Sequence, residues 1–176
     1  GVQALGKIPI DVEEAGIDLF TISGHKLHGP KGSGALYVRD RLELIPIFEG
    51  GGQERGLRSG TENVPAITGM GKAIKIASAE INNFYEHVMN MRKFLISEIQ
   101  NKIPDTYLNG PDMDSDLCAP HIANISFLGI KGEILVHALE EYGIYISTGA
   151  ACSSKKTSKS HVLDVMGCSP ERIESS

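Results

Sequence analysis

The sequence lacks any uninterrupted apolar run long enough to cross a membrane. Its amino terminus also lacks the charged and apolar regions of a signal peptide. Acidic and basic residues are mixed along the chain, with a net charge of −5, so no basic stripe favours binding to nucleic acid. We therefore expect a cytoplasmic protein with no membrane partner and no direct nucleic-acid partner.

Cysteine is scarce, because Cys118, Cys152 and Cys168 are the only three among 176 residues. This odd, widely spaced set fits neither a disulfide framework nor a group of zinc ligands, so we expect no metal site. Reduced thiols are typical of the cytosol. The length suits one domain or one and a half, and the apolar fraction of 41% is ordinary for a globular protein.

A short polar sequence, Ser23-Gly24-His25-Lys26, follows a predicted buried strand at residues 16–22. Residues 28–34 are too rich in glycine and proline to continue any element. A lysine at the end of a buried strand is partly desolvated, which favours the free amine that condenses with a carbonyl. Neighbouring hydroxyl and imidazole groups suit a phosphate, so a pyridoxal-phosphate lysine is one reading. A surface lysine in a turn is the commoner explanation of these four residues.

A second candidate site surrounds Cys152, which lies among small residues in segment 147–154. Small neighbours leave a thiol accessible, and Lys155 and Lys156 favour its thiolate form. A structural cysteine would more often lie inside an apolar segment. The residues alone leave a reactive and an unreactive thiol equally open.

A glycine-rich segment at residues 50–61 contains two arginines and ends in Ser59-Gly60-Thr61. Backbone amides are accessible where side chains are absent, and arginine adds a fork of donors, so this segment is a candidate anion-binding loop. Its spacing matches neither the dinucleotide motif nor the P-loop. A plain surface loop is the commoner explanation of such a composition.

The remaining pattern predicts an alternation of strands and helices. Strands are expected at 34–39, 121–127 and 144–146, with a weak one at 42–48, and helices at 65–86, 85–102 and 131–142. Three apolar faces are predicted to pack: Ile67, Met70, Ala73, Ile74 and Ala77 on the first helix, Val88, Met91, Leu95 and Ile99 on the second, and Ile122, Ile125 and Phe127 on the strand at 121–127.

The lysine segment, residues 23–32 followed by Gly34-Ala35-Leu36-Tyr37-Val38, closely resembles the cofactor-lysine segment of cysteine desulfurases. These enzymes belong to the class V aminotransferase group of fold-type-I pyridoxal-phosphate proteins. The glycine-rich loop and residues 148–167 resemble the same family, so the resemblance covers nearly the whole chain. It implies an α/β fold, with part of the large-domain sheet at residues 1–68. Residues 69–176 would form a linking helix and a small α+β domain.

The resemblance also implies a role for each site residue. Lys26 would hold pyridoxal 5′-phosphate as a Schiff base and move the substrate proton. Cys152 would accept sulfur from L-cysteine as a persulfide, which implies a sulfur-acceptor protein such as an iron–sulfur scaffold. Further cofactor contacts are implied for Ser23 and His25 with the phosphate, Gln3 with the phenolic oxygen, and Thr61 with the phosphate of a partner subunit in a homodimer.

Three residues of the family's active site fall outside these 176 residues: the ring-nitrogen aspartate, the stacked histidine and the carboxylate-binding arginine. We therefore expect a piece of a longer protein that is inactive alone and self-associates, because a cut parallel sheet exposes its edge. The alternatives are a selenocysteine lyase or other class V aminotransferase or lyase, and a non-catalytic dimerisation or binding domain. The long spacing from Cys152 to Ser160 resembles desulfurases with a mobile loop, which we expect to be poorly ordered.

Overall fold

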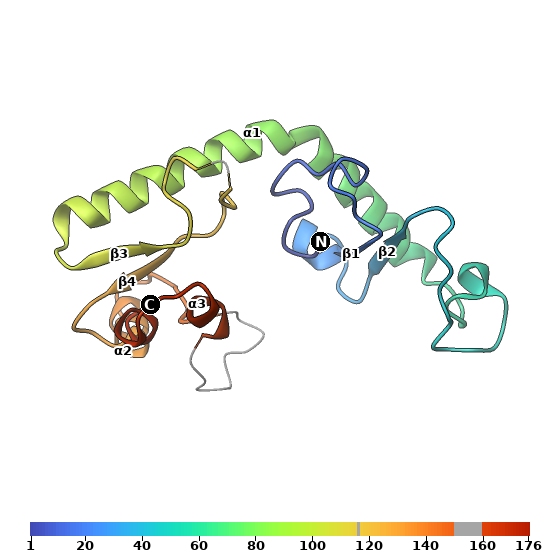
Figure 1. Ribbon diagram of the computed structural model, residues 1–176. Helices are drawn as coiled ribbons and strands as arrows, with labels where there is room; N and C mark the ends of the chain where they lie inside the picture. Colours follow the sequence, from blue (N-terminus) through green and yellow to red (C-terminus); the bar gives the residue numbers. More distant parts are fainter. Residues whose placement is uncertain (116, 150–159) are drawn as a thin grey trace. The chain divides into compact units, whose positions relative to one another are not determined.

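The computed structural model describes residues 1–115, 117–149 and 160–176 (Figure 1). The chain divides into two compact units, Gly1–Glu86 and His87–Ser176. The dividing point lies inside the long helix α1 (Val64–Lys102), which therefore contributes to both units. The boundary expected between residues 68 and 69 concerns the large and small domains of the family, and it stays a prediction.

The first unit contains one antiparallel strand pair, β1 (Leu19–Ser23) and β2 (Gly34–Val38), paired from Leu19↔Val38 to Ser23↔Gly34. The strand predicted at 16–22 therefore starts later than expected. It is also not buried, because only Phe20 is enclosed while Leu19 is 47% exposed. Two strands alone cannot cover both faces of a ribbon. Among the described residues, β1 has no parallel strand partner.

Arg39, which follows β2, holds the segment before β1 in place. Its guanidinium forms ion pairs with Asp18 at 3.1 Å and Glu13 at 3.3 Å, and it donates to the Ile17 carbonyl at 3.0 Å. The Tyr37 hydroxyl donates to the same Glu13 carboxylate at 3.3 Å. Desolvation, followed by the negative charge of Glu13, raises the pKa of Tyr37 above its ordinary value. These contacts hold β2 in place beside the lysine segment.

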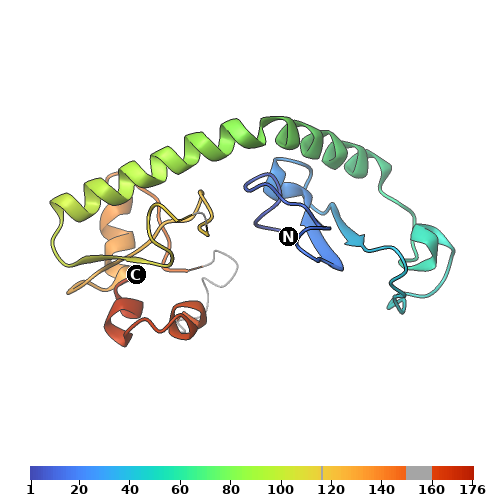
Figure 2. The same ribbon diagram turned by 45° about the horizontal axis from the view of Figure 1, so that its top comes forward.

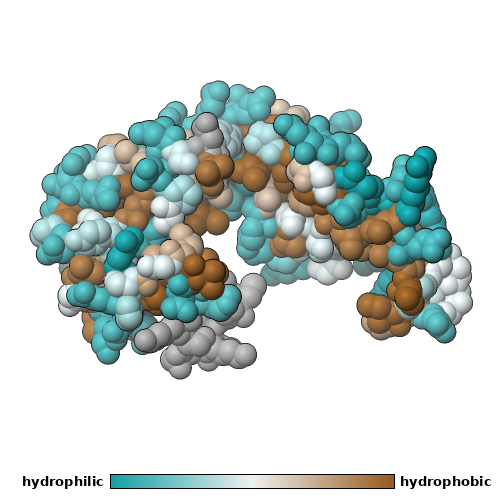
Figure 3. All heavy atoms as spheres, viewed as in Figure 1, coloured by the Kyte–Doolittle hydropathy of each residue, from teal (hydrophilic) through white to brown (hydrophobic). Residues whose placement is uncertain are grey.

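The weak strand predicted at 42–48 does not form. Its backbone is irregular, and only Phe48 makes a bridge, with Arg58. Ile45 and Ile47 are 92% and 87% exposed, because no neighbouring strand covers them within the described residues. Exposed apolar side chains of this kind contribute to the brown surface in Figure 3.

Helix α1 replaces the two helices predicted at 65–86 and 85–102, and its 39 residues run without a break (Figure 2). The expected interruption is absent because no glycine or proline occurs between residues 72 and 102. In the first unit, the predicted apolar face is confirmed at Met70, which is 6% exposed, whereas Ile67 is 42% exposed.

The buried face of α1 in the second unit differs from the prediction. Met89, Arg92 and Ile96 are enclosed, whereas the predicted residues Met91 and Leu95 are 58% and 49% exposed. The prediction grouped apolar residues only and so omitted Arg92. The Arg92 guanidinium can be buried in the unit because its Nε donates to the Ile122 carbonyl at 2.8 Å.

We expect Ile96→Ala to lower the free energy of unfolding by about 2–5 kcal/mol, since its side chain is fully enclosed and truncation would leave a cavity. Leu95→Ala is the matched control, because it removes a similar side chain from the exposed neighbouring position. The control should change stability by less than about 1 kcal/mol. Chemical denaturation followed by circular dichroism measures both, and equal losses would show that the buried face has been misassigned.

The second unit contains the antiparallel pair β3 (Thr106–Asn109) and β4 (Asn124–Phe127). β3 was not predicted, and β4 starts later than the predicted strand at 121–127, which leaves Ile122 53% exposed. Helix α2 (Gly132–Glu140) confirms the helix predicted at 131–142. The strand predicted at 144–146 does not form. Two short helices follow, α3 (His161–Val165) and α4 (Pro170–Glu174).

A buried polar network joins α4 to the β3–β4 pair. The Ser126 hydroxyl, which is fully enclosed, donates to the Arg172 carbonyl at 2.6 Å. The Asn109 amide donates to Ser126 Oγ and to Asn124 Oδ1, each at 2.7 Å. The Arg172 guanidinium donates to Asn109 Oδ1 at 2.5 Å and to the Leu108 carbonyl at 2.8 Å. Polar side chains therefore form part of the interior of this unit.

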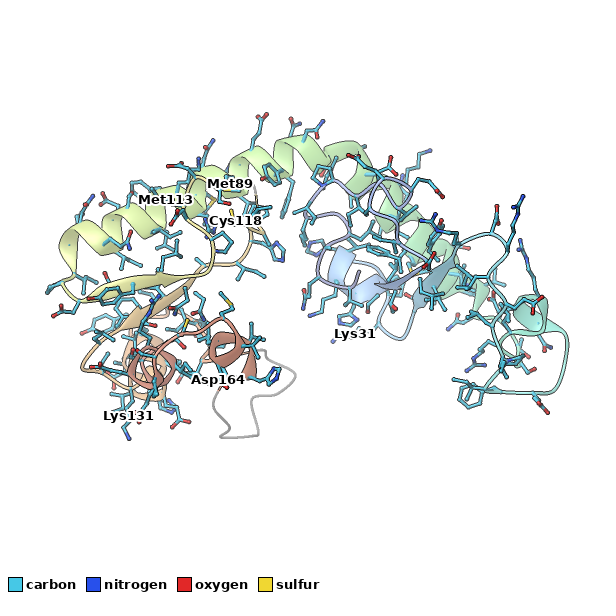
Figure 4. All side chains as sticks on the ribbon, viewed as in Figure 1. Lys31, Met89, Met113, Cys118, Lys131 and Asp164 are labelled. Atoms are coloured by element: carbon cyan, nitrogen blue, oxygen red, sulfur yellow. The ribbon has the colours of Figure 1, made fainter. Side chains whose placement is uncertain are left out.

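Cys118 is 7% exposed, and its thiol donates to the Ser115 carbonyl at 3.0 Å. Figure 4 labels it with Met113 and Met89, near the second half of α1.

Within residues 1–115, 117–149 and 160–176, no helix combines the length and apolar character needed to cross a bilayer. The same ranges contain no group of histidine, cysteine and carboxylate side chains placed to hold a metal ion.

Candidate functional site

Lys26 lies in a short 3₁₀ helix, η1 (Gly24–Leu27), that follows β1 directly. Ser23 precedes it with extended backbone, and His28 ends it in the left-handed region with φ 62°. Leu27 is 5% exposed and anchors the turn, while Lys26 itself is half-buried. The predicted position of this lysine, at the end of a strand and before a glycine-rich turn, is confirmed.

Ser23, His25 and Lys26 supply three polar side chains within four consecutive positions. Ser23 Oγ and His25 Nδ1 are 2.9 Å apart, within hydrogen-bonding distance. A hydroxyl and an imidazole can both donate to a phosphate, and the Lys26 amine is the group that condenses with an aldehyde. The chemistry of this set therefore fits pyridoxal phosphate, which carries both groups.

The loop after η1 is closed by hydrogen bonds that start and end at Gly24. The Gly24 amide donates to the Ser33 carbonyl, and the Gly29 amide donates to the Gly24 carbonyl, each at 2.9 Å. A Cβ added at Gly24 would lie 3.1 Å from the Pro30 carbonyl oxygen and 3.2 Å from that of Ser33. The turn therefore requires glycine at position 24, because no space is left for a side chain.

The first half of α1 packs against this loop. A Cβ added at Gly69 would lie 2.8 Å from Pro30 Cγ, and one added at Gly29 would lie 3.4 Å from Ala73 Cβ. The small residues of the helix thus allow the loop to approach it closely. Lys31, labelled in Figure 4, lies on the exposed part of the same loop.

Gln3 and Thr61, the two remaining cofactor contacts implied by the resemblance, are both exposed. Among the described residues, neither forms a hydrogen bond to Ser23 or to η1, which together make up the lysine turn. Thr61 lines an open groove of about 870 Å³, which Thr21 and Ser33 also line. Their roles therefore stay predictions, and the role of Thr61 concerns a second subunit.

The glycine-rich loop is held mainly by its own contacts. Its short helix η2 (Gln53–Gly56) contains Glu54 and Arg55 with φ of 50° and 58°. The Arg58 guanidinium donates to the Ser59 carbonyl at 2.6 Å and lies 5.6 Å from the centre of the Phe48 ring. In this chain Arg58 therefore contacts protein groups, and binding of an anion by this loop stays a prediction.

Cys152 lies outside the described residues, as does the segment 153–159 that was expected to be poorly ordered. The residues on either side, up to Gly149 and from Ser160 onward, are described. The Ser147 hydroxyl donates to the Gly149 carbonyl at 2.8 Å, and Ser160 Oγ accepts from the Leu163 amide at 3.4 Å, which caps α3. The proposed role of Cys152 thus depends on its sequence context.

Sequence comparison identifies relatives along nearly the whole chain. The cysteine desulfurase IscS of Clostridium botulinum strain Hall is 45% identical over 176 residues, which cover 99% of this chain and 44% of that protein. The cysteine desulfurase IscS of Dictyoglomus turgidum is 44% identical, covering 94% and 41%. A cysteine desulfurase of Nostoc sp. is 46% identical, with the same coverage. The chain therefore spans less than half the length of these relatives.

Structural comparison gives the same result. A NifS-like protein matches with a TM-score of 0.84 at 37% identity, covering 99% of this chain and 44% of that one. The NifS-like protein of Rickettsia africae matches with a TM-score of 0.83 at 31% identity and the same coverage. These neighbours confirm the predicted α/β fold of the fold-type-I class. The family model for class V aminotransferases matches residues 1–168, and the chain belongs to that family.

Proposed function

We propose that the protein is a cysteine desulfurase, which converts L-cysteine to L-alanine and leaves the sulfur as a persulfide on Cys152. The observation that carries this proposal is the 44–46% identity, along nearly the whole chain, with proteins named cysteine desulfurase. The lysine turn supports it, because Lys26, Ser23 and His25 have the chemistry that the cofactor requires. A solved relative named SspA, 32% identical with a TM-score of 0.68, was determined in complex with cysteine.

Pyridoxal phosphate would be held by residues of the first unit. Ser23 and His25 would bind its phosphate, Lys26 would bind its aldehyde carbon, and Gln3 would donate to its phenolic oxygen. Thr61 would contact the phosphate in a partner subunit, so we propose a homodimer with shared sites. When bound, the cofactor supplies an electron sink for negative charge at the substrate Cα.

Lys26 would act as general base and then as general acid at the substrate Cα. Its half-buried position at the end of β1 limits the directions available to the amine. The anchored neighbour Leu27 and the close packing at Gly24 keep the backbone of the turn fixed. A fixed amine is useful because proton transfer requires hydrogen-bonding distance to the reacting carbon.

Cys152 would carry out the sulfur transfer. Its thiolate attacks the substrate sulfur, an S–S bond forms, and the C–S bond breaks with its electron pair left on the substrate Cβ, which takes up a proton. L-cysteine and one thiol thus give L-alanine and one persulfide, so atoms and electrons balance without an external oxidant. A sulfur-acceptor protein, such as an iron–sulfur scaffold, would then receive the terminal sulfur. Free thiols suit the reducing cytoplasm.

The test uses the longer protein loaded with pyridoxal phosphate and supplied with L-cysteine. Alanine release is measured by chromatography, and mass spectrometry locates the additional sulfur atom. We expect alanine formation together with a persulfide on the peptide that contains Cys152. No alanine from a fully loaded protein would refute the proposal. A strong preference for L-selenocysteine, tested in parallel, would assign the protein to the lyases instead.

We expect Gly24→Ala to weaken binding of pyridoxal phosphate about 5- to 150-fold. The added methyl group would meet the Ser33 hydroxyl first and then the Pro30 and Ser33 carbonyls. Overpacking costs about 1–3 kcal/mol, which corresponds to that range. Gly71→Ala on α1 is the control, because nothing lies within 4 Å of a Cβ added there. Titration of the cofactor by absorbance measures both affinities. Equal affinity in the two variants would show that the turn tolerates a side chain.

A further inference from the structure

Ser33 closes the loop after the lysine turn with both its backbone and its side chain. Its carbonyl accepts from the Gly24 amide at 2.9 Å, and its hydroxyl donates to the Pro30 carbonyl at 2.6 Å. Neither bond involves the groups assigned to the cofactor or the substrate. The bonds therefore need a different explanation, in terms of the geometry of the loop.

Gly24 connects this closure to Lys26, because it is the first residue of η1. Its amide is bonded to Ser33, and its carbonyl accepts from the amides of Gly29 and His28. The Ser33 hydroxyl also lies directly against Gly24, since it is the first atom that an added Cβ would meet. Ser33 is thus bonded to and packed against the first residue of the helical turn that carries Lys26.

Pro30 connects the same closure to α1. A Cβ added at Gly69 would lie 2.8 Å from Pro30 Cγ and 3.1 Å from Pro30 Cδ, so the ring rests on the helix. The Ser33 hydroxyl holds the carbonyl of this proline. The loop consequently lies between helix α1 and the lysine turn, with the serine side chain as the link.

We infer that Ser33 is a positioning residue for Lys26, an inference that rests on the proposed function of that lysine. The Ser33 hydroxyl fixes the Pro30 carbonyl and packs against Gly24, and this keeps η1 in one conformation. The Lys26 amine then stays within reach of the atom at which it moves a proton. Ser33 contacts neither substrate nor cofactor in this role.

The first test compares Ser33→Ala, Ser33→Thr and the control Ser78→Ala in the longer protein loaded with cofactor. Ser78 is an exposed residue of α1. For Ser33→Ala we expect kcat for alanine formation to fall about 2- to 12-fold, the value of one hydrogen bond, with KM nearly unchanged. Ser33→Thr keeps the hydroxyl and should restore kcat. A change confined to KM, or no recovery with threonine, would overturn the inference.

The second test needs no cofactor and no activity. Amide hydrogen–deuterium exchange of the cofactor-free protein is measured for the peptide that contains residues 24–29. We expect faster exchange there in Ser33→Ala and unchanged exchange in Ser33→Thr and Ser78→Ala. Unchanged exchange in Ser33→Ala, or acceleration throughout the first unit, would overturn the inference. The exchange result is independent of the reaction. Failure of the proposed function would appear separately, as a Lys26 variant that still carries the attached cofactor and still forms alanine.

Discussion

Replacement of Lys26 by alanine is expected to lower the rate of alanine formation at least about 10²- to 10⁴-fold, the contribution typical of general acid–base catalysis. The amine is the only basic group of η1 that can both bind an aldehyde and return a proton, since its neighbour His25 is paired with Ser23 at 2.9 Å. The longer protein should also lose the covalent attachment of pyridoxal phosphate. Borohydride reduction followed by peptide mass spectrometry measures this attachment directly.

Lys31→Ala is the matched control for Lys26→Ala. Lys31 lies on the same loop, five positions further along, and its side chain is exposed. The control should keep both the attached cofactor and the rate, because the loop's hydrogen bonds use Pro30 and Ser33 instead. An unchanged cofactor-labelled peptide in Lys26→Ala would assign the attachment to another lysine and refute the site.

Replacement of Cys152 by serine is expected to abolish persulfide formation and lower desulfuration at least about a thousand-fold, as removal of a catalytic nucleophile does. Binding of pyridoxal phosphate should be retained, because the Ser23, His25 and Lys26 side chains are unchanged. This separation of binding from turnover distinguishes a sulfur carrier from a residue needed for folding. Alanine assays and cofactor absorbance measure the two effects.

The other two cysteines provide the controls for Cys152. In the wild-type protein we expect alkylation of Cys152 before Cys118, which is 7% exposed and whose thiol donates to the Ser115 carbonyl. Cys168 is half-buried, with its sulfur 3.7 Å from Asn109 Oδ1, so Cys168→Ala should keep the activity. Modification of Cys118 or Cys168 before Cys152 would remove the argument that Cys152 is the reactive thiol.

The lysine turn could be predicted from the sequence because its chemistry is contained in a few consecutive residues. Ser23, His25 and Lys26 lie within four positions at the end of a strand, and the turn brings the Ser23 and His25 side chains to 2.9 Å of each other. Helix α2 was predicted for a similar reason, since its apolar periodicity and the glycine after it are local signals. The class V family could likewise be identified from short motifs.

The tertiary structure alone decided which polar residues are enclosed. Arg92 faces inward because the Ile122 carbonyl, thirty positions away, accepts its hydrogen bond. Ser126 is enclosed because its hydroxyl donates to the Arg172 backbone carbonyl across a separation of 46 residues. Ser33 is linked to Lys26 only through Gly24 and the loop that folds back on it. Burial of a polar group depends on a partner that satisfies it, and a partner distant in the chain leaves no periodic signal in the sequence.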